Sequence, residues 1–509
     1  MSSYPTPPDS IPTTPTKQLS EGQVTPALGT DHVPSSSMGY TSSLLYLVDG
    51  LTSCASSTIN TISWSPLVSG ARMVILSMMK HSIRHGQLRI LSVDGEWTFG
   101  SALAEPDKCV EIKVIRDTFW LRLVTMGDLG FAEAYMAGDC EVSDLPQVFR
   151  IFIRSRPSLA STNIPGISTL PSKLFRYISS LTNSRFANTL SNTIFNISAH
   201  YDLSNGMFSA FLSDDMTYSC AIFPELDADL SAQKLHHLNN GQDELEDAQM
   251  AKIRHIIRQA DIRQGHRVLE IGSGWGSFAI EAVKQTGCTV DTITLSAQQK
   301  KLAEERVKKA GLGGRVRVWL MDYRALPESW KSSFDRVVSI EMLEQVGKEF
   351  TPGYFSVLDS VLKSNGVACF QVITIPESRF EQYQKGIDFI RKWIFPGGFL
   401  PTISFITDAI QVGANNRLII DSVSNIGPHY ARTLREWRRR FLQNFDELIS
   451  PALRAEHPEM TAGDIEVFKR KWLYYFCYCE VGFSERILGD HIFTLVREGN
   501  REYGCTTLA

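Results

Sequence analysis

The fold is decided by residues 268–276, which read Val268-Leu269-Glu270-Ile271-Gly272-Ser273-Gly274-Trp275-Gly276. A short β-type run passes directly into a five-residue stretch in which every other residue is glycine. An amphipathic helical pattern follows this stretch. The glycines therefore lie at a strand-to-helix turn, where a residue without Cβ can take positive φ and approach a ligand closely. The first turn of the following helix favours an anionic group such as a carboxylate. The stretch predicts a cofactor-binding turn that closes the first strand of a βαβ unit.

Helix-like and strand-like patterns alternate on both sides of this turn. A helical pattern reaches about Ala260, and further helical patterns start at Trp275 and Ala297. This alternation predicts an α/β domain with a doubly wound, mostly parallel sheet and helices on both faces. The predicted strands of the sheet are residues 267–271, 289–294, 316–320 and 336–339.

The spacing of the glycines separates two kinds of cofactor. Dinucleotide-binding turns use G-x-G-x-x-G, whereas Gly272, Gly274 and Gly276 alternate with single residues, which favours S-adenosylmethionine over NAD. The usual ribose partner, an acid about twenty residues further on, would be Asp291. Because Asp291 lies inside the second predicted strand rather than at its end, we expect other groups to bind the ribose.

The first part of the chain changes character near residue 41. Residues 1–40 are rich in Ser, Thr and Pro with little to bury, which predicts a disordered tail. Residues 41–155 predict a small N-terminal α+β domain, because short β-type runs are separated by turn signals. A turn that enters a helix is expected at residues 127–136. The β-type runs are residues 87–93, 96–100 and 110–115.

A second boundary is expected between residues 156 and 195. This stretch combines several Pro residues with Ser, Thr and Asn, which is typical of a linker, and it holds a short amphipathic helical pattern at 174–181. Residues 196–500 then form the domain that carries the cofactor turn, with helical additions around its sheet.

Composition excludes several classes of protein. A net charge of −4 and a pI near 6.3 argue against nucleic-acid binding, which usually needs clustered Lys and Arg in excess. The nine cysteines have no spacing typical of a zinc site or a disulfide framework, so we expect no metal and a reducing compartment. No signal-like segment and no apolar run of about eighteen residues occurs, which predicts a cytoplasmic protein that can be peripheral to a membrane.

Further motifs accompany the glycine turn in a fixed order. They are His200-Tyr201-Asp202-Leu203-Ser204-Asn205, Met216-Thr217-Tyr218-Ser219-Cys220, Thr292-Ile293-Thr294-Leu295-Ser296 with Gln299, Asp322-Tyr323-Arg324, Ser339-Ile340-Glu341-Met342-Leu343-Glu344, Phe395-Pro396-Gly397-Gly398, His429-Tyr430 with Thr433-Leu434, and Cys479-Glu480-Val481-Gly482-Phe483. This order resembles that of the cyclopropane-fatty-acyl-phospholipid synthases and mycolic-acid cyclopropane synthases, which are class I, Rossmann-like, S-adenosylmethionine-dependent methyltransferases. The resemblance covers roughly residues 195–497, and residues 127–138 resemble a segment that longer, phospholipid-acting members carry.

The resemblance implies a set of residues that bind S-adenosylmethionine. In the family, the cofactor is held by the Tyr-Ser pair before the Cys, the glycine turn, the end of the following strand and the next Gln, with a Tyr at the adenine. On this sequence these positions are Tyr218, Ser219, Gly272, Gly274, Gly276, Thr294, Gln299 and Tyr323.

The resemblance also implies a bicarbonate ion beside the transferred methyl group. Family members bind it with a Cys, a Glu and a Tyr, which correspond here to Cys220, Glu344 and Tyr430. Gln371 stands where many bacterial members have a bicarbonate-binding His, and Gln345 replaces the His that usually follows the Glu. Glutamine can donate a hydrogen bond but cannot titrate, so the predicted catalytic set is Cys220, Glu344, Gln371 and Tyr430 with an altered anion pocket.

The reaction that the resemblance implies is methylation of a cis double bond in an unsaturated phospholipid acyl chain at a membrane surface, with a homodimer as the candidate assembly. Methyl transfer to an alkene leaves a carbocation, which aromatic faces can stabilise and a base must deprotonate to close a cyclopropane ring. Loss of the proton elsewhere would give a methyl- or methylene-branched chain from this or another unsaturated lipid. A catalytically degenerate lipid-binding homologue is the third alternative. The aromatic candidates are Tyr201, Phe208, Tyr218, Trp275, Tyr430, Tyr474, Tyr475 and Phe483.

An arginine-rich segment leaves two interpretations open. Five arginines between residues 432 and 440 alternate with Leu434, Trp437 and Phe441. They could form a patch that faces an anionic membrane, or a helix face paired with Glu436 and other acids.

Overall fold

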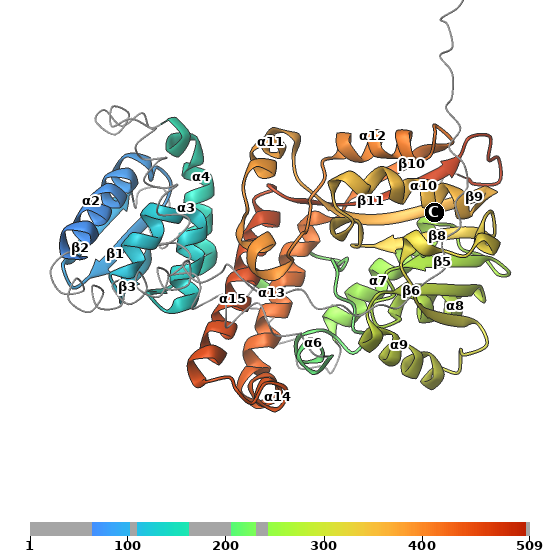
Figure 1. Cartoon of the computed structure of the whole chain (residues 1–509), viewed down its shortest axis with the longest axis horizontal. Coiled ribbons are helices and arrows are strands. Elements are labelled where there is room, and N and C mark those ends of the chain that lie inside the picture. The colour runs from blue at the N-terminus through green and yellow to red at the C-terminus, as the bar shows by residue number, and fades with distance from the viewer. Residues whose placement is uncertain (1–63, 102–108, 162–204, 231–242, 505–509) are drawn as a thin grey trace, which may run out of the picture. The chain divides into compact units, whose positions relative to one another are not determined.

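A computed structural model describes residues 64–101, 109–161, 205–230 and 243–504 (Figure 1). The expected disordered tail, most of the expected linker and the helical pattern at 174–181 lie outside the described residues. Among the described helices, none is long and apolar enough to cross a lipid bilayer.

Within the described residues, the larger sheet has seven strands in the order β10-β11-β9-β8-β5-β6-β7. The five strands from β9 to β7 pair in parallel, whereas β11 runs antiparallel to both of its neighbours. This architecture confirms the predicted doubly wound, mostly parallel sheet. The strands are β5 (Arg267–Ile271), β6 (Thr289–Thr294), β7 (Val316–Leu320), β8 (Phe334–Ile340), β9 (Leu362–Thr374), β10 (Leu418–Asn425) and β11 (Gly489–Arg497).

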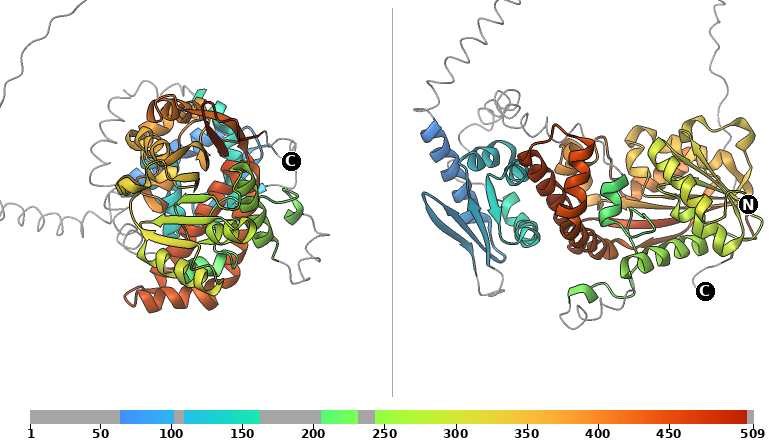
Figure 2. Two further views of the ribbon diagram at one scale, coloured as in Figure 1. Left: turned by 90° about the vertical axis from the view of Figure 1, so that its right-hand side faces the viewer. Right: turned by 90° about the horizontal axis from the view of Figure 1, so that it is seen from below.

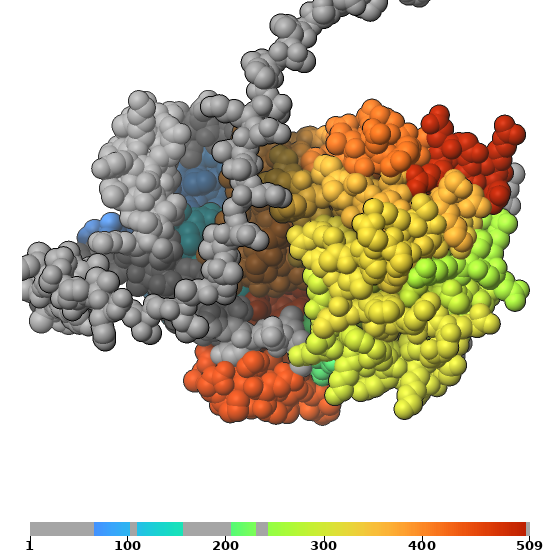
Figure 3. Space-filling model, turned by 45° about the vertical axis from the view of Figure 1, so that its right-hand side comes forward, coloured from blue at the N-terminus to red at the C-terminus, as the bar shows by residue number. Residues whose placement is uncertain are grey.

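Two layers of helices flank this sheet (Figure 1). Helices α7, α8 and α9 form one layer, with α7 packed on α8, while α10 packs on α12 in the other. In Figure 3 the strands and helices between residues 244 and 413, coloured light green to orange, form one closely packed surface. The helices are α7 (Glu244–Gln259), α8 (Ser277–Thr286), α9 (Ala297–Lys309), α10 (Thr351–Val361), α11 (Glu377–Lys385) and α12 (Ile403–Gly413).

Further helices form the expected additions to the sheet. Helices α13 and α15 lie side by side (Figures 1 and 2), and α13 also contacts α6 and β11. A capping box begins α15, in which the Thr461 hydroxyl and the Asp464 carboxylate satisfy each other's backbone N–H groups. The added helices are α6 (Asn205–Phe211), α13 (Gly427–Asn444), α14 (Ser450–Glu456) and α15 (Ala462–Ser484).

The core of the larger part lies between the sheet and the α10–α12 layer. Leu269, Phe370 and Phe493 are fully buried there, and the rings of Phe370 and Phe493 stack with centroids 4.9 Å apart. Each apolar strand residue that is buried in this way adds about 1.5–3 kcal/mol of stabilisation. The sheet that positions the glycine turn is therefore stabilised by this hydrophobic core.

In the described part of the N-terminal region, four strands form a second sheet with the order β2-β1-β3-β4. This mixture of strands and helices confirms the α+β character predicted for the region, whereas its bounds as a domain, residues 41–155, stay a prediction. Its elements are α2 (Trp64–Ser82), β1 (Gln87–Ser92), β2 (Gly95–Gly100), β3 (Cys109–Val114), α3 (Thr118–Ala137), β4 (Cys140–Val142) and α4 (Leu145–Ser161).

Helix α3 differs from the expected turn at residues 127–136. The helix already begins at Thr118, because Phe119 and Trp120 are buried in the N-terminal part, and it kinks rather than starts at Gly127. Gly127 has φ 56° and ψ −126°, a conformation that glycine adopts without a Cβ clash. The sequence signal thus marked a kink inside a helix.

Candidate active site

The glycine turn follows β5 as predicted. Gly272, Gly274 and Gly276 have φ of 97°, 46° and 89°. The N–H groups of Gly272 and Ser273 donate to the carbonyl of Ile293, at 3.1 and 3.0 Å. These bonds fix the turn to the end of the neighbouring strand β6, so the three glycines take positions that side chains would strain.

Thr294, Gln299 and Tyr323 lie beyond the carboxyl ends of the next two strands. The Thr294 hydroxyl donates to Gln299 Oε1 at 2.9 Å, and the Ser296 hydroxyl accepts from the Gln299 N–H as the N-cap of α9. Tyr323 is half-buried and packs edge-on against Tyr354, with ring centroids 5.4 Å apart. Since β6 and β7 pair with β5 in order, these side chains lie along the same edge of the sheet as the glycine turn.

Tyr218 and Ser219 belong to a segment that crosses this edge. The Tyr218 hydroxyl lies 3.1 Å from the Tyr475 hydroxyl, while the Ser219 hydroxyl accepts from the ammonium group of Lys252. Lys252 is 0% exposed, and burial lowers its pKa from the usual value. Lys252 was not predicted as a site residue, because in the sequence it is one of several polar residues in an amphipathic helical pattern.

Three of the four residues predicted to be catalytic converge on a residue that was not predicted, Glu341. The Cys220 N–H donates to Glu341 Oε1 at 2.8 Å, and Gln371 Nε2 donates to the same oxygen at 2.7 Å. The Tyr430 hydroxyl donates to Glu341 Oε2 at 2.7 Å. Glu341 directly follows β8 and has φ 47°, a backbone conformation that is strained for a residue with a side chain.

Asp490 forms a second carboxyl group in this cluster. Gln371 Nε2 donates to Asp490 Oδ2 at 2.7 Å, so the amide bridges Asp490 and Glu341. Burial and the Glu341 charge raise the pKa of Asp490 well above its usual value. Burial also raises the pKa of Glu341, but its N–H and hydroxyl donors and the nearby Lys252 favour its charged form. Because the two carboxyl groups lie in one buried site, each disfavours the charged form of the other.

Glu344 lies next to this cluster rather than inside its hydrogen-bond set. Its Oε1 accepts from the Ile373 N–H at 2.6 Å, and its side chain is buried. Burial first, and then the Glu341 charge, raises the pKa of Glu344 to about 8. The two glutamates thus share one neighbourhood, but Cys220, Gln371 and Tyr430 bond to Glu341.

Aromatic rings surround the carboxylate cluster. Tyr430 stacks on Phe483 with ring centroids 4.5 Å apart and also contacts Trp437. Tyr218 lies 4.9 Å from Trp437, and its other neighbours include Phe208. Four predicted aromatic residues, Tyr218, Tyr430, Tyr475 and Phe483, therefore border the cluster.

The remaining aromatic candidates lie elsewhere or beyond Tyr218. Phe208 and Trp275 pack on each other behind Tyr218, with ring centroids 5.1 Å apart. Tyr474 packs on Phe389 and Tyr478. Tyr201 lies outside the described residues.

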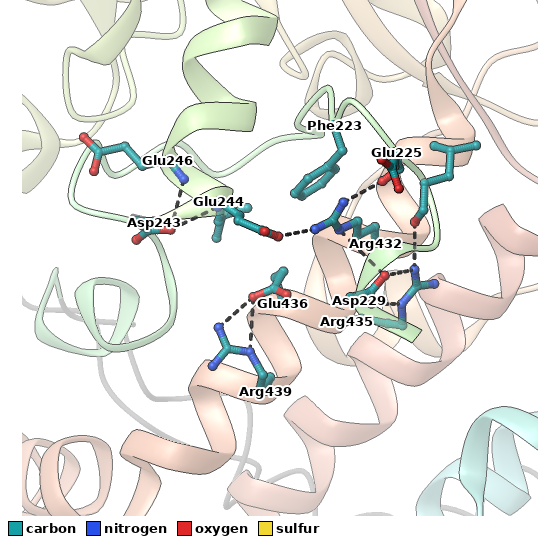
Figure 4. Close-up of polar contacts among 12 residues, drawn as sticks. Phe223, Glu225, Asp229, Asp243, Glu244, Glu246, Arg432, Arg435, Glu436 and Arg439 are labelled. Atoms are coloured by element: carbon teal, nitrogen blue, oxygen red, sulfur yellow. Dashed lines mark hydrogen bonds and ion pairs between the residues drawn. The ribbon is translucent and has the colours of Figure 1, made fainter. Parts of the chain in front are cut away.

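The arginines of α13 are paired within the chain. Figure 4 shows Arg432 bonded to Glu244 and Arg435 bonded to Asp229. The side chains of Arg432 and Arg435 are only 3% and 10% exposed. The structure therefore favours the paired helix face over a patch that faces a membrane. The other pairs are Arg438 with Glu480, Arg439 with Glu436 and Arg440 with Asp243.

The residues missed by sequence reasoning share one property. Glu341 lies in the same quoted block as Glu344, but nothing in the sequence distinguishes which of the two faces Tyr430. Asp490 and Lys252 are residues with ionisable side chains that are 0% exposed. A charged residue at a position where the pattern demands burial is the signal that could have found them.

The residues present fit S-adenosylmethionine better than they fit bicarbonate. Three of the five residues in the turn are glycines, which lack a Cβ, and the polar side chains of Thr294 and Gln299 adjoin the turn at the strand ends. The donors that would hold bicarbonate, in contrast, already bond to the Glu341 carboxylate. The anion pocket of this chain is thus filled by its own side chain.

Replacing Gly272 by Ala is expected to weaken binding of S-adenosylmethionine about 5- to 30-fold. At φ 97° an added Cβ brings a strain of roughly 1–2 kcal/mol, and it would meet Met342 at 3.4 Å. Isothermal titration calorimetry measures the change. Gly314→Ala is the control, because a Cβ there meets no atom within 4 Å. Equal affinity of both variants would contradict the assignment of the turn.

Glu270→Gln is expected to change how stability depends on pH. Burial raises the pKa of Glu270 from 4.5 to about 8, so the unfolded chain releases this proton between those values while the native chain keeps it. Wild-type stability then falls as pH rises, by up to about 1.4 kcal/mol per unit. The advantage of the variant should grow from pH 5 to pH 8 and then level off, as measured by urea denaturation. A constant difference across this range would show that Glu270 is charged in the native state.

Comparison with known proteins agrees with this geometry. Residues 188–493 match the family model described as mycolic acid cyclopropane synthetase. The chain is 35% identical over 434 residues to the tuberculostearic acid methyltransferase UfaA1 of Mycobacterium tuberculosis, covering 85% of this chain and 93% of the relative. It is 31% identical over 379 residues to the cyclopropane-fatty-acyl-phospholipid synthase of Escherichia coli K12, covering 74% and 85%.

One solved structure supports the fold. Coclaurine N-methyltransferase, at 17% identity, superposes with a TM-score of 0.52 over 72% of this chain and 98% of that one, which supports the class I methyltransferase fold alone. The cyclopropane synthase MmaA2 of Mycobacterium tuberculosis is 26% identical, with a TM-score of 0.47 over 59% of this chain and 97% of that one. On the match of residues 188–493 and the two relatives, the chain belongs to the mycolic acid cyclopropane synthetase family and is an S-adenosylmethionine-dependent methyltransferase.

Proposed function

We propose that the chain methylates a cis double bond in an unsaturated fatty acyl chain of a phospholipid and closes a cyclopropane ring. The observation that supports this most is the neighbourhood of Glu341, where a carboxylate and aromatic rings meet next to the glycine turn. An electron-poor methyl group, an electron-rich alkene and a base must meet in a dry space for this reaction.

The positions of the predicted cofactor residues support the roles that we propose for them. When bound, S-adenosylmethionine supplies a sulfonium methyl group. The turn at Gly272, Gly274 and Gly276 lets the cofactor approach the backbone, Thr294 and Gln299 bind its polar groups, and Tyr323 lies against the adenine. Tyr218 and Ser219 close the other side, and Lys252 holds the Ser219 hydroxyl in place.

The aromatic residues stabilise the cation that forms on the substrate. Tyr430, Phe483 and Trp437 present ring faces and edges close to Glu341. An aromatic face stabilises a nearby cation by about 0.5–2 kcal/mol. The same rings exclude water, which would otherwise add to the cation and give an alcohol.

A second candidate shares the first step. The relative named tuberculostearic acid methyltransferase, 93% of which is covered by this chain, supports methylation of another unsaturated acyl lipid, with a methylene- or methyl-branched product. The third alternative, a degenerate lipid-binding homologue, is disfavoured because a carboxylate with its donors and the glycine turn are all present.

The test is incubation with deuterium-labelled S-adenosylmethionine and vesicles of a monounsaturated phospholipid, followed by mass analysis of the fatty acids. We expect a labelled acyl chain without a double bond, whose proton NMR spectrum contains the upfield signals of a cyclopropane. Vesicles of a saturated phospholipid are the control. A labelled chain with vinylidene protons would favour the second candidate, whereas absence of label in every lipid would overturn the proposal.

We also propose where the reaction takes place and in which oligomeric state. A phospholipid substrate requires that the chain bind a membrane surface peripherally, which co-sedimentation with these vesicles tests. A homodimer stays a prediction, which light scattering of the full chain tests.

A further inference from the structure

We infer that the carboxylate of Glu341 is this enzyme's own catalytic base, in place of a bicarbonate ion. The inference rests on the proposed function, because only a reaction that forms a cation next to a new methyl group needs a base at this point. It predicts methyl transfer that is independent of bicarbonate.

Among the described residues, the three hydrogen-bond donors that converge on Glu341 are already engaged. The Cys220 N–H and the Tyr430 hydroxyl each have a single hydrogen, and both point to Glu341. The amide of Gln371 has two hydrogens, which go to Glu341 and Asp490. A bicarbonate ion here would have to displace Glu341, and it would meet the negative charge of that side chain.

The accessible surface distinguishes Glu341 from the other carboxyl groups. Asp490 is 0% exposed and Glu344 is buried, whereas Glu341 is only half-buried. Of these three residues, Glu341 therefore has the most accessible surface.

The sheet places Glu341 next to the cofactor turn. Strand β8 pairs in parallel with β5, with Ser339 opposite Ile271, so Glu341 and Gly272 follow neighbouring strands at the same edge. Met342, the next residue, lies 3.4 Å from the position that a Cβ of Gly272 would take. Glu341 has a strained φ of 47°. Strained backbone conformations of this kind are concentrated at functional sites.

The groups that face Glu341 set its charge. Lys252 contributes a positive charge and the Cys220 N–H and Tyr430 hydroxyl stabilise the anion, while Asp490 opposes a second negative charge. Gln371 is neutral, and the pKa of Glu344 is raised to about 8. The hydrogen-bond donors that surround Glu341 therefore favour its carboxylate form, which a proton acceptor requires.

The chemical step balances with Glu341 as the only acceptor. The π electron pair of the alkene forms a bond to the methyl carbon while the bond between that carbon and sulfur breaks, which leaves a cation on the adjacent chain carbon. A C–H bond of the new methyl group then breaks, its electron pair closes the ring, and the proton goes to a Glu341 carboxylate oxygen. Release of that proton to solvent restores the base, so the products are a cyclopropane, S-adenosylhomocysteine and one proton.

The test compares the wild type with Glu341→Gly in buffer stripped of carbon dioxide, with and without added sodium bicarbonate. Glycine suits the positive φ, so this variant relieves backbone strain and opens the anion pocket. Binding of S-adenosylmethionine by calorimetry shows that the variant is folded. Glu349→Ala is the matched control, because Glu349 is an exposed acid eight residues further along.

We expect the rates of the wild type and of Glu349→Ala to change less than twofold on removal of bicarbonate. Glu341→Gly should lose about 10²- to 10⁴-fold without bicarbonate, and bicarbonate should restore part of that loss. A wild-type rate that falls more than tenfold on removal of bicarbonate, or a Glu341→Gly rate that stays within tenfold of the wild type without it, would overturn the inference.

A second readout does not depend on turnover. With S-adenosylhomocysteine present, the NMR signal of ¹³C-labelled bicarbonate should broaden or shift with Glu341→Gly but not with the wild type. Binding by the wild type would overturn the inference. If the wild type labels no lipid at all, the proposed function fails, and this NMR measurement alone decides whether Glu341 occupies the anion pocket.

Discussion

Replacing Tyr430 by Phe is expected to lower kcat about 10- to 150-fold and to leave the affinity for S-adenosylmethionine within twofold. The Tyr430 hydroxyl donates to Glu341 Oε2 at 2.7 Å, and a hydrogen bond to a charged group is worth about 1.5–3 kcal/mol. Phe keeps the ring that stacks on Phe483, so the change removes the hydroxyl alone. Initial rates with labelled cofactor and calorimetry of cofactor binding measure the two effects.

Tyr503→Phe is the control for this prediction. Its hydroxyl donates to the carbonyl of Gln259 at 2.9 Å, away from the carboxylate cluster, so its loss should not affect kcat. Equal losses of kcat and of cofactor affinity in Tyr430→Phe would mean that Tyr430 shapes the cofactor site instead of supporting the reaction.

Gly413→Ala is expected to destabilise the sheet-bearing part by about 3 kcal/mol or more. An added Cβ would lie 2.1 Å from the Pro352 carbonyl oxygen and 2.9 Å from the Phe355 Cβ, where α12 meets α10. Overpacking usually costs about 1–3 kcal/mol, and a backbone oxygen at this distance cannot move aside as a side chain can. The midpoint of urea denaturation, followed by far-UV circular dichroism, measures the loss.

Gly353→Ala provides the matched control in the same pair of helices. It lies inside α10, and a Cβ there meets no atom within 4 Å. Ala in a helix interior is favoured over Gly by about 0.5–1 kcal/mol, so this variant should be neutral or slightly more stable. Comparable destabilisation by both substitutions would show that α10 and α12 do not pack as closely as described.

The parallel strands were predictable because local pattern and burial agree there. Strands β5, β6 and β7 have the predicted bounds, since each is a short apolar run between turn signals that lies inside a covered sheet. Gly127 was misread because glycine permits both a turn and a helix kink, and only the burial of Phe119 and Trp120 decides between them. A local signal could not settle a choice made by tertiary packing.

The site was predictable as a neighbourhood but not as a set of contacts. Cys220, Gln371 and Tyr430 do come together, although 210 residues separate the first from the last. Their common partner, Glu341, depends on a positive φ and on which of two nearby glutamates turns inward. Such choices depend on distant elements such as β11, which supplies Asp490, and no short window of sequence contains them.

The position of β11 in the sheet has a consequence for the protein during its synthesis on the ribosome. Strand β11 lies between β9 and β10, yet Arg497 at its end follows Thr374 at the end of β9 by 123 residues. At about 5–20 residues per second, the nascent chain spends roughly 6–25 s with the glycine turn formed and the pairing edge of β9 still bare. We expect the growing chain to need protection of that edge from neighbouring nascent chains, and to acquire Asp490, and with it a complete carboxyl pair, only at the close of this interval.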